Sequence, residues 1–335
     1  MNYSQRILAF SKLGDTFTQV QDDLPVLNQA FIHNQWFTIQ MQLQAIKAWG
    51  NLLKNENLTK WLTPYQLSVQ TEPEIVAIIM AGNIPLVGFH DLLCVLISGN
   101  KALIKLSSDD SELMKWTIEQ LIAIEPEFKD LIAFAEERQL KNFDAVIATG
   151  SNNTNRYFEY YFKDKPNLLR RTRNSLAIIT GEETELELDS LADDVFFYFG
   201  LGCRNVSKLL LPRGYNLEPL FLAFEKYKDI INHNKYANNY TYHKAIFLMN
   251  LTPHLDNGFL ILKQDDGLAS PLSVLLFSFY DTEEEVKAYL ETNKEIIQCG
   301  VGTADYLVDF GKSQQPELWD YADGIDTMEF LKNLV

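Results

Sequence analysis

The sequence predicts an α/β protein with two three-layer α/β/α domains, each built on a mostly parallel sheet. Short apolar runs typical of buried strands alternate with longer amphipathic runs typical of helices from about residue 74 onward. The alternation starts a second time near residue 190. The chain has 335 residues, 47% hydrophobic and 22% charged, which is enough to bury the cores of two domains.

The N-terminal part favours helices, and a strand–helix–strand unit follows it. The helical spacing of apolar residues in WFTIQMQLQAIKAWGNLL (36–53) and its surroundings predicts two or three amphipathic helices before residue 65. EIVAIIMAG (74–82) then predicts a buried strand, NIPLVGFHDLLCVLISGN (83–100) a loop and an apolar helix, and KALIKLSS (101–108) a second strand. This order predicts two parallel strands joined by a helix.

The rest of the chain continues the alternation. In the first set we expect a helix at 110–126, a strand at 143–151, a helix at 153–162 and a strand at 175–181. In the second set we expect a helix at 189–199, a strand at 206–214, a helix at 217–232, strands at 244–250, 258–264 and 273–279, a helix at 282–293 and a strand at 296–302. The predicted domains are 1–173, which includes the N-terminal helices, 174–312, which carries Cys203, and a C-terminal segment, 313–335.

Charge and cysteine content exclude several classes of protein. The net charge of −16 argues against binding to nucleic acid or to an anionic membrane surface, so an anionic substrate needs a local basic patch. Cys94, Cys203 and Cys299 are too few and too scattered for a disulfide framework or a metal site, which favours a reducing, cytoplasmic setting. The N-terminus lacks the pattern of a secretion signal, and polar residues interrupt the apolar stretch 75–104, so we expect no membrane span.

Three loops at predicted strand ends carry candidate functional residues. Open α/β sheets bind ligands at such ends. AGNIPLVG contains Asn83, ATGS contains Gly150 and Ser151 before a helix that could receive a phosphate, and GLGCRN contains Cys203. Taken singly, each pattern is also explained by turn geometry, and Cys203 by packing in a core.

The order of these motifs resembles the aldehyde dehydrogenase superfamily from about residue 70 to about residue 305. The matching features are Asn-x-Pro after a strand, LIKLSS, TGS, the glycine-rich cysteine loop before SKLLLP, and DDGLASPLSVLLFSFYDTEEEVKAYLETN. Within the superfamily, RRTRNS, NNYTYHKAIFLMN and DYADGIDTMEFL look most like LuxC-type acyl-CoA reductases. The resemblance implies an aldehyde dehydrogenase-like fold, with a nucleotide-binding, Rossmann-like domain after the N-terminal helices in 1–173 and a catalytic-cysteine domain at 174–312.

The resemblance also implies roles for individual residues. Cys203 matches the catalytic nucleophile, and Asn83 matches the side-chain donor to the oxyanion that forms during acyl transfer. His243 is a candidate proton donor, although a single histidine at the start of the strand expected there is more often structural.

Further residues match the nucleotide-binding positions. Lys105 matches the lysine that contacts the adenosine ribose, and Gly150 and Ser151 match the pyrophosphate loop. Ser108 stands where NAD-selective members often carry a carboxylate. Lys105 and the hydroxyls of Ser107 and Ser108 favour NADPH, while Asp109 and Asp110 nearby oppose it.

Departures from the family pattern narrow the expected reaction. Hydrolytic aldehyde dehydrogenases carry a water-activating glutamate upstream of the cysteine, but the matching RRTRNSLAII contains no carboxylate. This favours reduction of an acyl thioester, with acyl-CoA or an acyl-donor enzyme as partner. The basic residues Lys163, Lys165, Arg170, Arg171 and Arg173 are either a phosphate-binding patch or a solvated rim.

Two alternatives to the reductase remain open. Gly267 stands near the position of the family's ribose-binding glutamate, which leaves an acyltransferase or thioesterase without hydride transfer as one of them. A catalytically silent subunit is the other. The resemblance also implies a possible homo-oligomer.

Overall fold

The computed structural model describes residues 1–67, 72–135 and 140–334. It divides into two compact units, residues 1–171 with 317–335, and residues 172–316. Each contains a mostly parallel sheet with helices on both faces, so the predicted α/β class is confirmed. The C-terminal segment returns to the first unit, where helix α12 (Thr327–Lys332) packs against helix α5 (Phe89–Ser98).

The first unit is built on a five-stranded, wholly parallel sheet in the order β3-β2-β1-β4-β5. Its strands are β1 (Ile75–Ile79), β2 (Lys101–Lys105), β3 (Ile132–Phe134), β4 (Ala145–Thr149) and β5 (Asn167–Arg170). The predicted strands are present, while β3 and β5 were not predicted. Both are short edge strands whose sequences lack a long apolar run.

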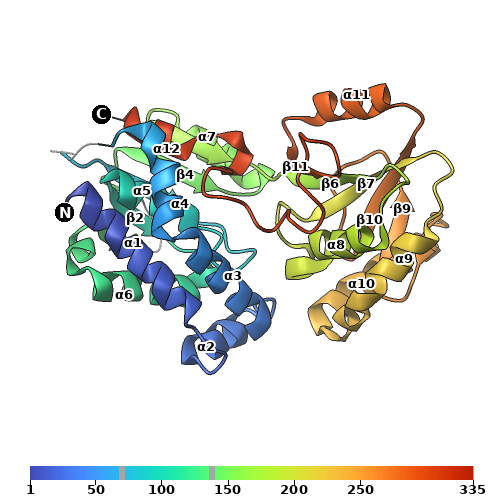
Figure 1. The fold of residues 1–335 in the computed structure, drawn as a ribbon, viewed down its shortest axis with the longest axis horizontal. Helices are drawn as coiled ribbons and strands as arrows, with labels where there is room; N and C mark the ends of the chain where they lie inside the picture. Colours follow the sequence, from blue (N-terminus) through green and yellow to red (C-terminus); the bar gives the residue numbers. More distant parts are fainter. Residues whose placement is uncertain (68–71, 136–139, 335) are drawn as a thin grey trace. The chain divides into compact units, whose positions relative to one another are not determined.

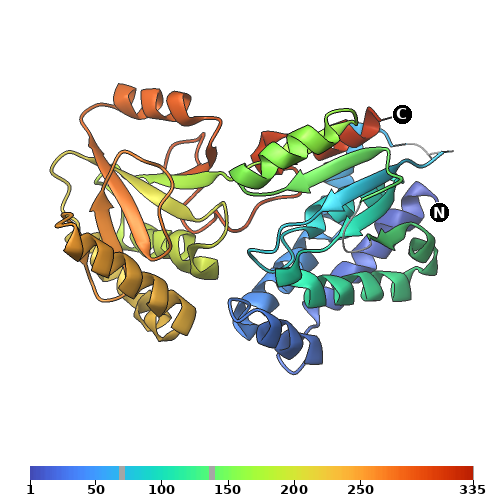
Figure 2. The ribbon, with the colours of Figure 1, turned by 180° about the vertical axis from the view of Figure 1, so that it is seen from behind.

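Helices cover the two faces of this sheet (Figures 1 and 2). Before the sheet the described chain forms α1 (Tyr3–Thr18), α2 (Pro25–His33), α3 (Ile39–Leu52) and α4 (Asn55–Leu62), four α-helices where two or three were expected. Together with α5, α6 (Ser111–Ile124) and α12 they enclose the larger core. Helix α7 (Asn152–Phe162) packs on the opposite face, where Phe158 and Phe162 meet Ala77 and Val146.

The second unit contains a six-stranded sheet in the order β11-β6-β7-β10-β9-β8. Its strands are β6 (Asn174–Ile178), β7 (Val206–Pro212), β8 (Leu255–Asp256), β9 (Ile261–Gln264), β10 (Val274–Tyr280) and β11 (Ile297–Val301), of which only β8 runs antiparallel to its neighbour. The helices are α8 (Glu185–Phe196), α9 (Glu218–Phe224), α10 (Asn234–Met249) and α11 (Glu283–Asn293). Helices α8 and α9 cover one core and α11 another.

One predicted strand is wrong. The run KAIFLMN (244–250) belongs to helix α10 and its C-terminal end. A seven-residue apolar run fits a strand or a helix equally well, and the helical spacing is visible only from further upstream. Tyr236 and Tyr240, four residues apart, are the two buried side chains of α10.

Candidate functional site

The C-terminal ends of β2, β1 and β4 lie side by side in the first unit. Ile79 of β1 pairs with Lys105 on one side and with Ala148 on the other. The chain passes from β1 to β2 on one side and later returns to β4 on the other, so this edge is a topological switch point, where parallel sheets bind ligands. It carries the Asn83 and TGS loops, which the sequence placed at strand ends, and Lys105, the last residue of β2. The third predicted loop, that of Cys203, lies in the second unit, after α8 and before β7.

The Asn83 loop is held tightly against the turn that follows β2. A Cβ atom added to Gly82 would lie 2.3 Å from Ser107 Oγ, so only glycine allows this approach. Leu86 has a left-handed backbone (φ 58°), and its amide donates to Asp110 Oδ2 at 2.8 Å. Asn83 itself is exposed on this fixed loop.

Asp110 connects the turn after β2 to the Asn83 loop. Its side chain is 4% exposed and points inward to the Leu86 amide. Burial raises the pKa of Asp110 well above its ordinary value, although the hydrogen bond from Leu86 opposes the rise. Asp110 is therefore a structural residue whose negative charge is disfavoured, and not a charge facing the edge of the sheet.

The turn Ser107–Asp109 presents hydroxyl groups beside Lys105. Ser107 Oγ accepts a hydrogen bond from the Asp109 amide at 3.2 Å, while Lys105 and Ser108 are exposed. Helix α2 contacts this turn, because His33 Nε2 lies 2.5 Å from the Ser108 carbonyl oxygen. Sequence reasoning missed His33, since no local pattern relates two segments 75 residues apart.

The TGS loop is fixed at the start of α7. Ser151 is the N-cap residue, and its Oγ accepts from the Thr154 amide at 3.3 Å. Asn155, which is buried and which we did not predict, donates to the carbonyls of Gly150 at 3.3 Å and Arg170 at 2.6 Å. The exposed Ser151 and the N-terminal end of an 11-residue helix therefore face the sheet edge.

The basic residues at 163–173 differ in burial and in their partners, so they form neither a single phosphate-binding patch nor a single solvated rim. Arg170 is 5% exposed and pairs with Asp91, and it donates to Thr327 Oγ1 at 2.7 Å. Arg171 pairs with the exposed Glu159. Strand periodicity explains the difference, because neighbouring residues at the end of β5 point to opposite faces of the sheet.

In the second unit, Cys203 lies exposed in the turn between α8 and β7. The segment that leads to it is strained, because Tyr198, Phe199 and Gly200 all have left-handed backbones, with φ of 51°, 58° and 77°. Such conformations cost about 1–3 kcal/mol each in residues other than glycine and concentrate at functional sites. The burial of Tyr198 and Phe199 stabilises this backbone.

Asn205 organises the cysteine loop, and sequence reasoning missed it. Its side chain is 3% exposed. Oδ1 accepts from the Gly202 amide at 2.8 Å, and Nδ2 donates to the carbonyls of Asp194 at 3.0 Å and Phe197 at 2.8 Å. One amide thus caps the C-terminal end of α8 and fixes the residue before Cys203.

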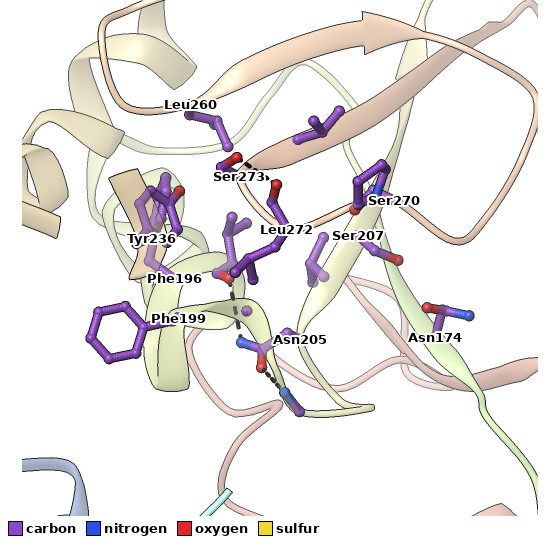
Figure 3. Close-up of a pocket in the computed structure, with 16 residues that line it drawn as sticks. Asn174, Phe196, Phe199, Asn205, Ser207, Tyr236, Leu260, Ser270, Leu272 and Ser273 are labelled. Carbon is purple, nitrogen blue, oxygen red and sulfur yellow. Dashed lines mark hydrogen bonds between the residues drawn. The ribbon is translucent and has the colours of Figure 1, made fainter. Parts of the chain in front are cut away.

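A pocket opens beside this loop (Figure 3). Gly202 and Asn205 line it, so it begins at the residue next to Cys203. Figure 3 shows Phe199 and Tyr236 on one side and Ser207 and Asn174 on the other. The lining combines aromatic and aliphatic side chains with several serine and asparagine groups, so the pocket offers hydrogen-bond partners as well as apolar contacts.

Ser175 links the cysteine loop to strand β11. Its buried hydroxyl donates to the Cys203 carbonyl at 3.0 Å, and it accepts from the Cys299 amide at 3.2 Å. Cys299 Sγ lies 3.1 Å from the same hydroxyl. The carbonyl of the Cys203 turn is therefore fixed by the sheet.

His243 lies on α10, seven residues after the pocket residue Tyr236, which corresponds to about 10 Å of helix. Its ring contacts Tyr242 and Phe247, at centroid distances of 5.1 and 6.4 Å. Partial burial lowers the pKa of His243. The pocket lining does not include His243, so its role in proton transfer stays a prediction.

The residues at the sheet edge of the first unit fit a dinucleotide. Lys105, two serine hydroxyls and the start of α7 are the donors that phosphate groups require, in an otherwise acidic protein. In the described part of the chain, no three His, Cys, Asp or Glu side chains are placed to hold a metal ion. None of the described helices is both long and apolar enough to cross a bilayer.

Comparison with known families decides the classification. The model of the family "Acyl-CoA reductase (LuxC)" matches residues 45–218, just over half of the chain. The chain belongs to the LuxC family of acyl-CoA reductases. This confirms the predicted relationship, and it places the chain in a family of oxidoreductase enzymes.

Individual relatives of this LuxC-family chain are distant. A long-chain acyl-protein thioester reductase of Aliivibrio fischeri is 25% identical over 230 residues, which cover 62% of this chain and 47% of the relative. The chain thus spans about half the length of that protein.

Solved aldehyde dehydrogenases share the fold. An indole-3-acetaldehyde dehydrogenase complexed with NAD⁺ is 13% identical with a TM-score of 0.68, over 93% of this chain and 73% of its own. A Mycobacterium tuberculosis aldehyde dehydrogenase complexed with NAD⁺ is 16% identical with a TM-score of 0.64, over 99% and 83%. The predicted aldehyde dehydrogenase-like fold is confirmed.

Proposed function

We propose that this protein reduces an acyl thioester to an aldehyde with a nicotinamide dinucleotide, through a covalent thioester on Cys203. The observation that carries the proposal is the extent of the family match, because residues 45–218 include Asn83, Lys105, Ser151 and Cys203. Cys203 is exposed, and the segment that leads to it is strained and held by Asn205, which supports its role as the nucleophile.

The proposed reaction consists of an acyl transfer to Cys203 followed by a hydride transfer to the acyl group. The Cys203 thiolate attacks the acyl carbonyl carbon, the bond from that carbon to the donor sulfur breaks, and the donor thiolate leaves and takes a proton. The dinucleotide supplies a hydride. The Cys203 thioester, once reduced, is a thiohemiacetal that releases the aldehyde and restores the cysteine. In total, acyl-CoA, NADPH and one proton give aldehyde, CoA and NADP⁺.

We assign Asn83 to the oxyanion, as a side-chain amide donor on a fixed loop. The acyl donor is CoA or an acyl-carrying protein, the second because the Aliivibrio fischeri relative is named as an acyl-protein thioester reductase. His243 receives no step in this proposal.

NADPH is our choice of cofactor. Lys105, Ser107 and Ser108 offer one ammonium and two hydroxyl groups, and none of them is a carboxylate that would repel a ribose 2′-phosphate. The nearby Asp110 points inward and has a raised pKa, so it offers little opposition. Asp109 is exposed and remains the one opposing carboxylate within this turn.

The experiment combines acyl-CoAs of C4 to C16 with NADPH, and follows nicotinamide absorbance beside intact mass. We expect NADPH oxidation and an acyl adduct, both lost in Cys203→Ala and both kept in the control Cys94→Ala, whose thiol is buried in the core of the first unit. Reduction that persists in Cys203→Ala would overturn the proposal. The third possibility is a catalytically silent subunit. It would be favoured if Cys203 acquired no acyl group and NADPH stayed reduced, both with acyl-CoA and with an acyl-carrying protein as donor.

A second candidate is an acyltransferase or thioesterase without hydride transfer. Gly267 offers no side chain where the family resemblance expects a carboxylate. The neighbouring Asp265 is already engaged, since its Oδ2 pairs with Lys263 at 2.5 Å and its Oδ1 accepts from the Gly267 amide at 2.8 Å. An acyl adduct without NADPH oxidation or nicotinamide binding would favour this function.

A further inference from the structure

We infer that His33 contacts the ribose 2′-phosphate of the dinucleotide and thereby contributes to the choice of NADPH over NADH. The inference rests on the proposed function, since it requires a dinucleotide at the sheet edge of the first unit. It adds a residue from an N-terminal helix to a site otherwise built from the loops that follow the strands.

The position of His33 carries the inference. His33 is exposed and ends helix α2, and its Nε2 lies 2.5 Å from the carbonyl oxygen of Ser108. The next residue, Asn34, donates from Nδ2 to the Asp109 carbonyl at 3.3 Å. The end of α2 is therefore held against the turn that we assign to the 2′-phosphate.

The charged groups around His33 include few carboxylates that would repel an anion. Lys105 is exposed and cationic, whereas Asp110 is buried and points to the Leu86 amide. Glu112 is close enough for His33 to contribute to the lowering of its pKa, after larger effects from the Ser111 hydroxyl and Lys115. Glu112 also accepts hydrogen bonds from Ser111 at 3.0 Å and Lys115 at 3.5 Å. The exposed Asp109 is the carboxylate that the cations must outweigh.

Imidazole chemistry suits this position. A ring that donates from Nε2 to the Ser108 carbonyl has Nδ1 as its second nitrogen, which carries a proton only in the imidazolium form. His33 then supplies a charge-assisted donor, in addition to the Lys105 ammonium and the serine hydroxyl groups.

The test uses two cofactor fragments that differ in the 2′-phosphate. Binding of 2′,5′-ADP and of 5′-AMP to the full chain is measured by calorimetry for the wild type, His33→Gln and His254→Gln. Glutamine can still donate to the Ser108 carbonyl but carries no charge. His254 is the matched control, because its Nδ1 also lies 2.8 Å from a main-chain carbonyl, that of Thr252 in the second unit.

We expect the wild type and His254→Gln to bind 2′,5′-ADP more tightly than 5′-AMP. In His33→Gln we expect about tenfold weaker binding of 2′,5′-ADP and nearly unchanged binding of 5′-AMP, because one charge-assisted hydrogen bond is lost. Added salt reduces the difference between the two fragments in the wild type.

Two outcomes separate this inference from the proposed function. Equal weakening of both fragments in His33→Gln, or no change in either, overturns the role of His33 while the nucleotide site stands. If neither fragment binds the wild type, the proposed cofactor chemistry fails, and the inference fails with it. A circular dichroism spectrum of each variant checks that it is folded.

Discussion

Asp91 and Arg170 form a buried ion pair, with 2.6 Å between Asp91 Oδ1 and Arg170 Nη1. The pair joins helix α5, which follows the Asn83 loop, to strand β5, which adjoins β4 and its TGS loop. Arg170 also donates to Thr327 at the start of α12. Two loops of the candidate nucleotide site and the returning C-terminal segment therefore depend on one guanidinium group.

We expect Asp91→Asn to lower the free energy of unfolding by about 3–5 kcal/mol, because it leaves a buried arginine without its counter-charge. Urea unfolding followed by circular dichroism measures the change. The control is Asp281→Asn, which breaks the exposed Arg213–Asp281 pair and should leave stability nearly unchanged. Similar losses in both variants would show that burial does not determine the contribution of the Asp91 pair.

The sequence was sufficient to predict that the strands within each sheet are mostly parallel, because buried parallel strands are continuous apolar runs separated by helices. It also placed Asn83 and Ser151 on loops that follow strands, whereas the strand order that makes these two loops neighbours comes from the structure. It could not predict that Arg170 is buried, because its counter-charge Asp91 is 79 residues away in the chain. The same holds for His33 and for Asn205, whose roles depend on tertiary contacts.

Asn205 provides a test of how the cysteine loop is positioned. Asn205→Asp keeps an acceptor for the Gly202 amide but removes the donors to the carbonyls at the end of α8. Asn205→Ala removes both. We expect Asn205→Ala to lose about 1–3 kcal/mol of stability, because buried polar groups lose their partners.

We also expect slower acylation of Cys203 in both Asn205 variants. Intact mass against time with a fixed acyl-CoA gives the rate, with Cys94→Ala as a variant that should keep the wild-type rate. Wild-type acylation by a stably folded Asn205→Ala would show that this side chain does not position Cys203.

Leu251 has a strained backbone conformation, although its side chain is not buried in a core. It follows the end of α10 with a left-handed backbone (φ 51°), and it is 88% exposed. Glycine is the preferred residue at this position after a helix. We expect Leu251→Gly to raise the free energy of unfolding by about 1 kcal/mol. Met249→Gly, at an exposed helical position two residues earlier, should lower it by about 1 kcal/mol.

Both variants are compared with the wild type by urea unfolding. If Leu251→Gly destabilises as much as Met249→Gly, then the Leu251 side chain makes a stabilising contact and the backbone is not the dominant effect.

Lys208 is a fully buried lysine on β7, and its ammonium group donates to the Asp265 main-chain carbonyl. Burial lowers the pKa of Lys208 to about 8, although Asp266 and Asp265 oppose the shift. Between pH 8 and its ordinary value near 10.5, the unfolded chain binds this proton more strongly than the folded chain does. Lys208 therefore adds stability as the pH rises through this range, and costs stability below it.

We expect Lys208→Met to lose this rise, so that its melting temperature, relative to that of the wild type, falls progressively between pH 8 and 10. Methionine has a similar length and no charge to bury, so the comparison isolates the titration from the packing. Lys287→Met, on the exposed face of α11, is the control and should follow the wild-type pH dependence. If the difference in melting temperature between Lys208→Met and the wild type stays constant over this pH range, the Lys208 amine keeps its proton in the folded protein as readily as in the unfolded chain.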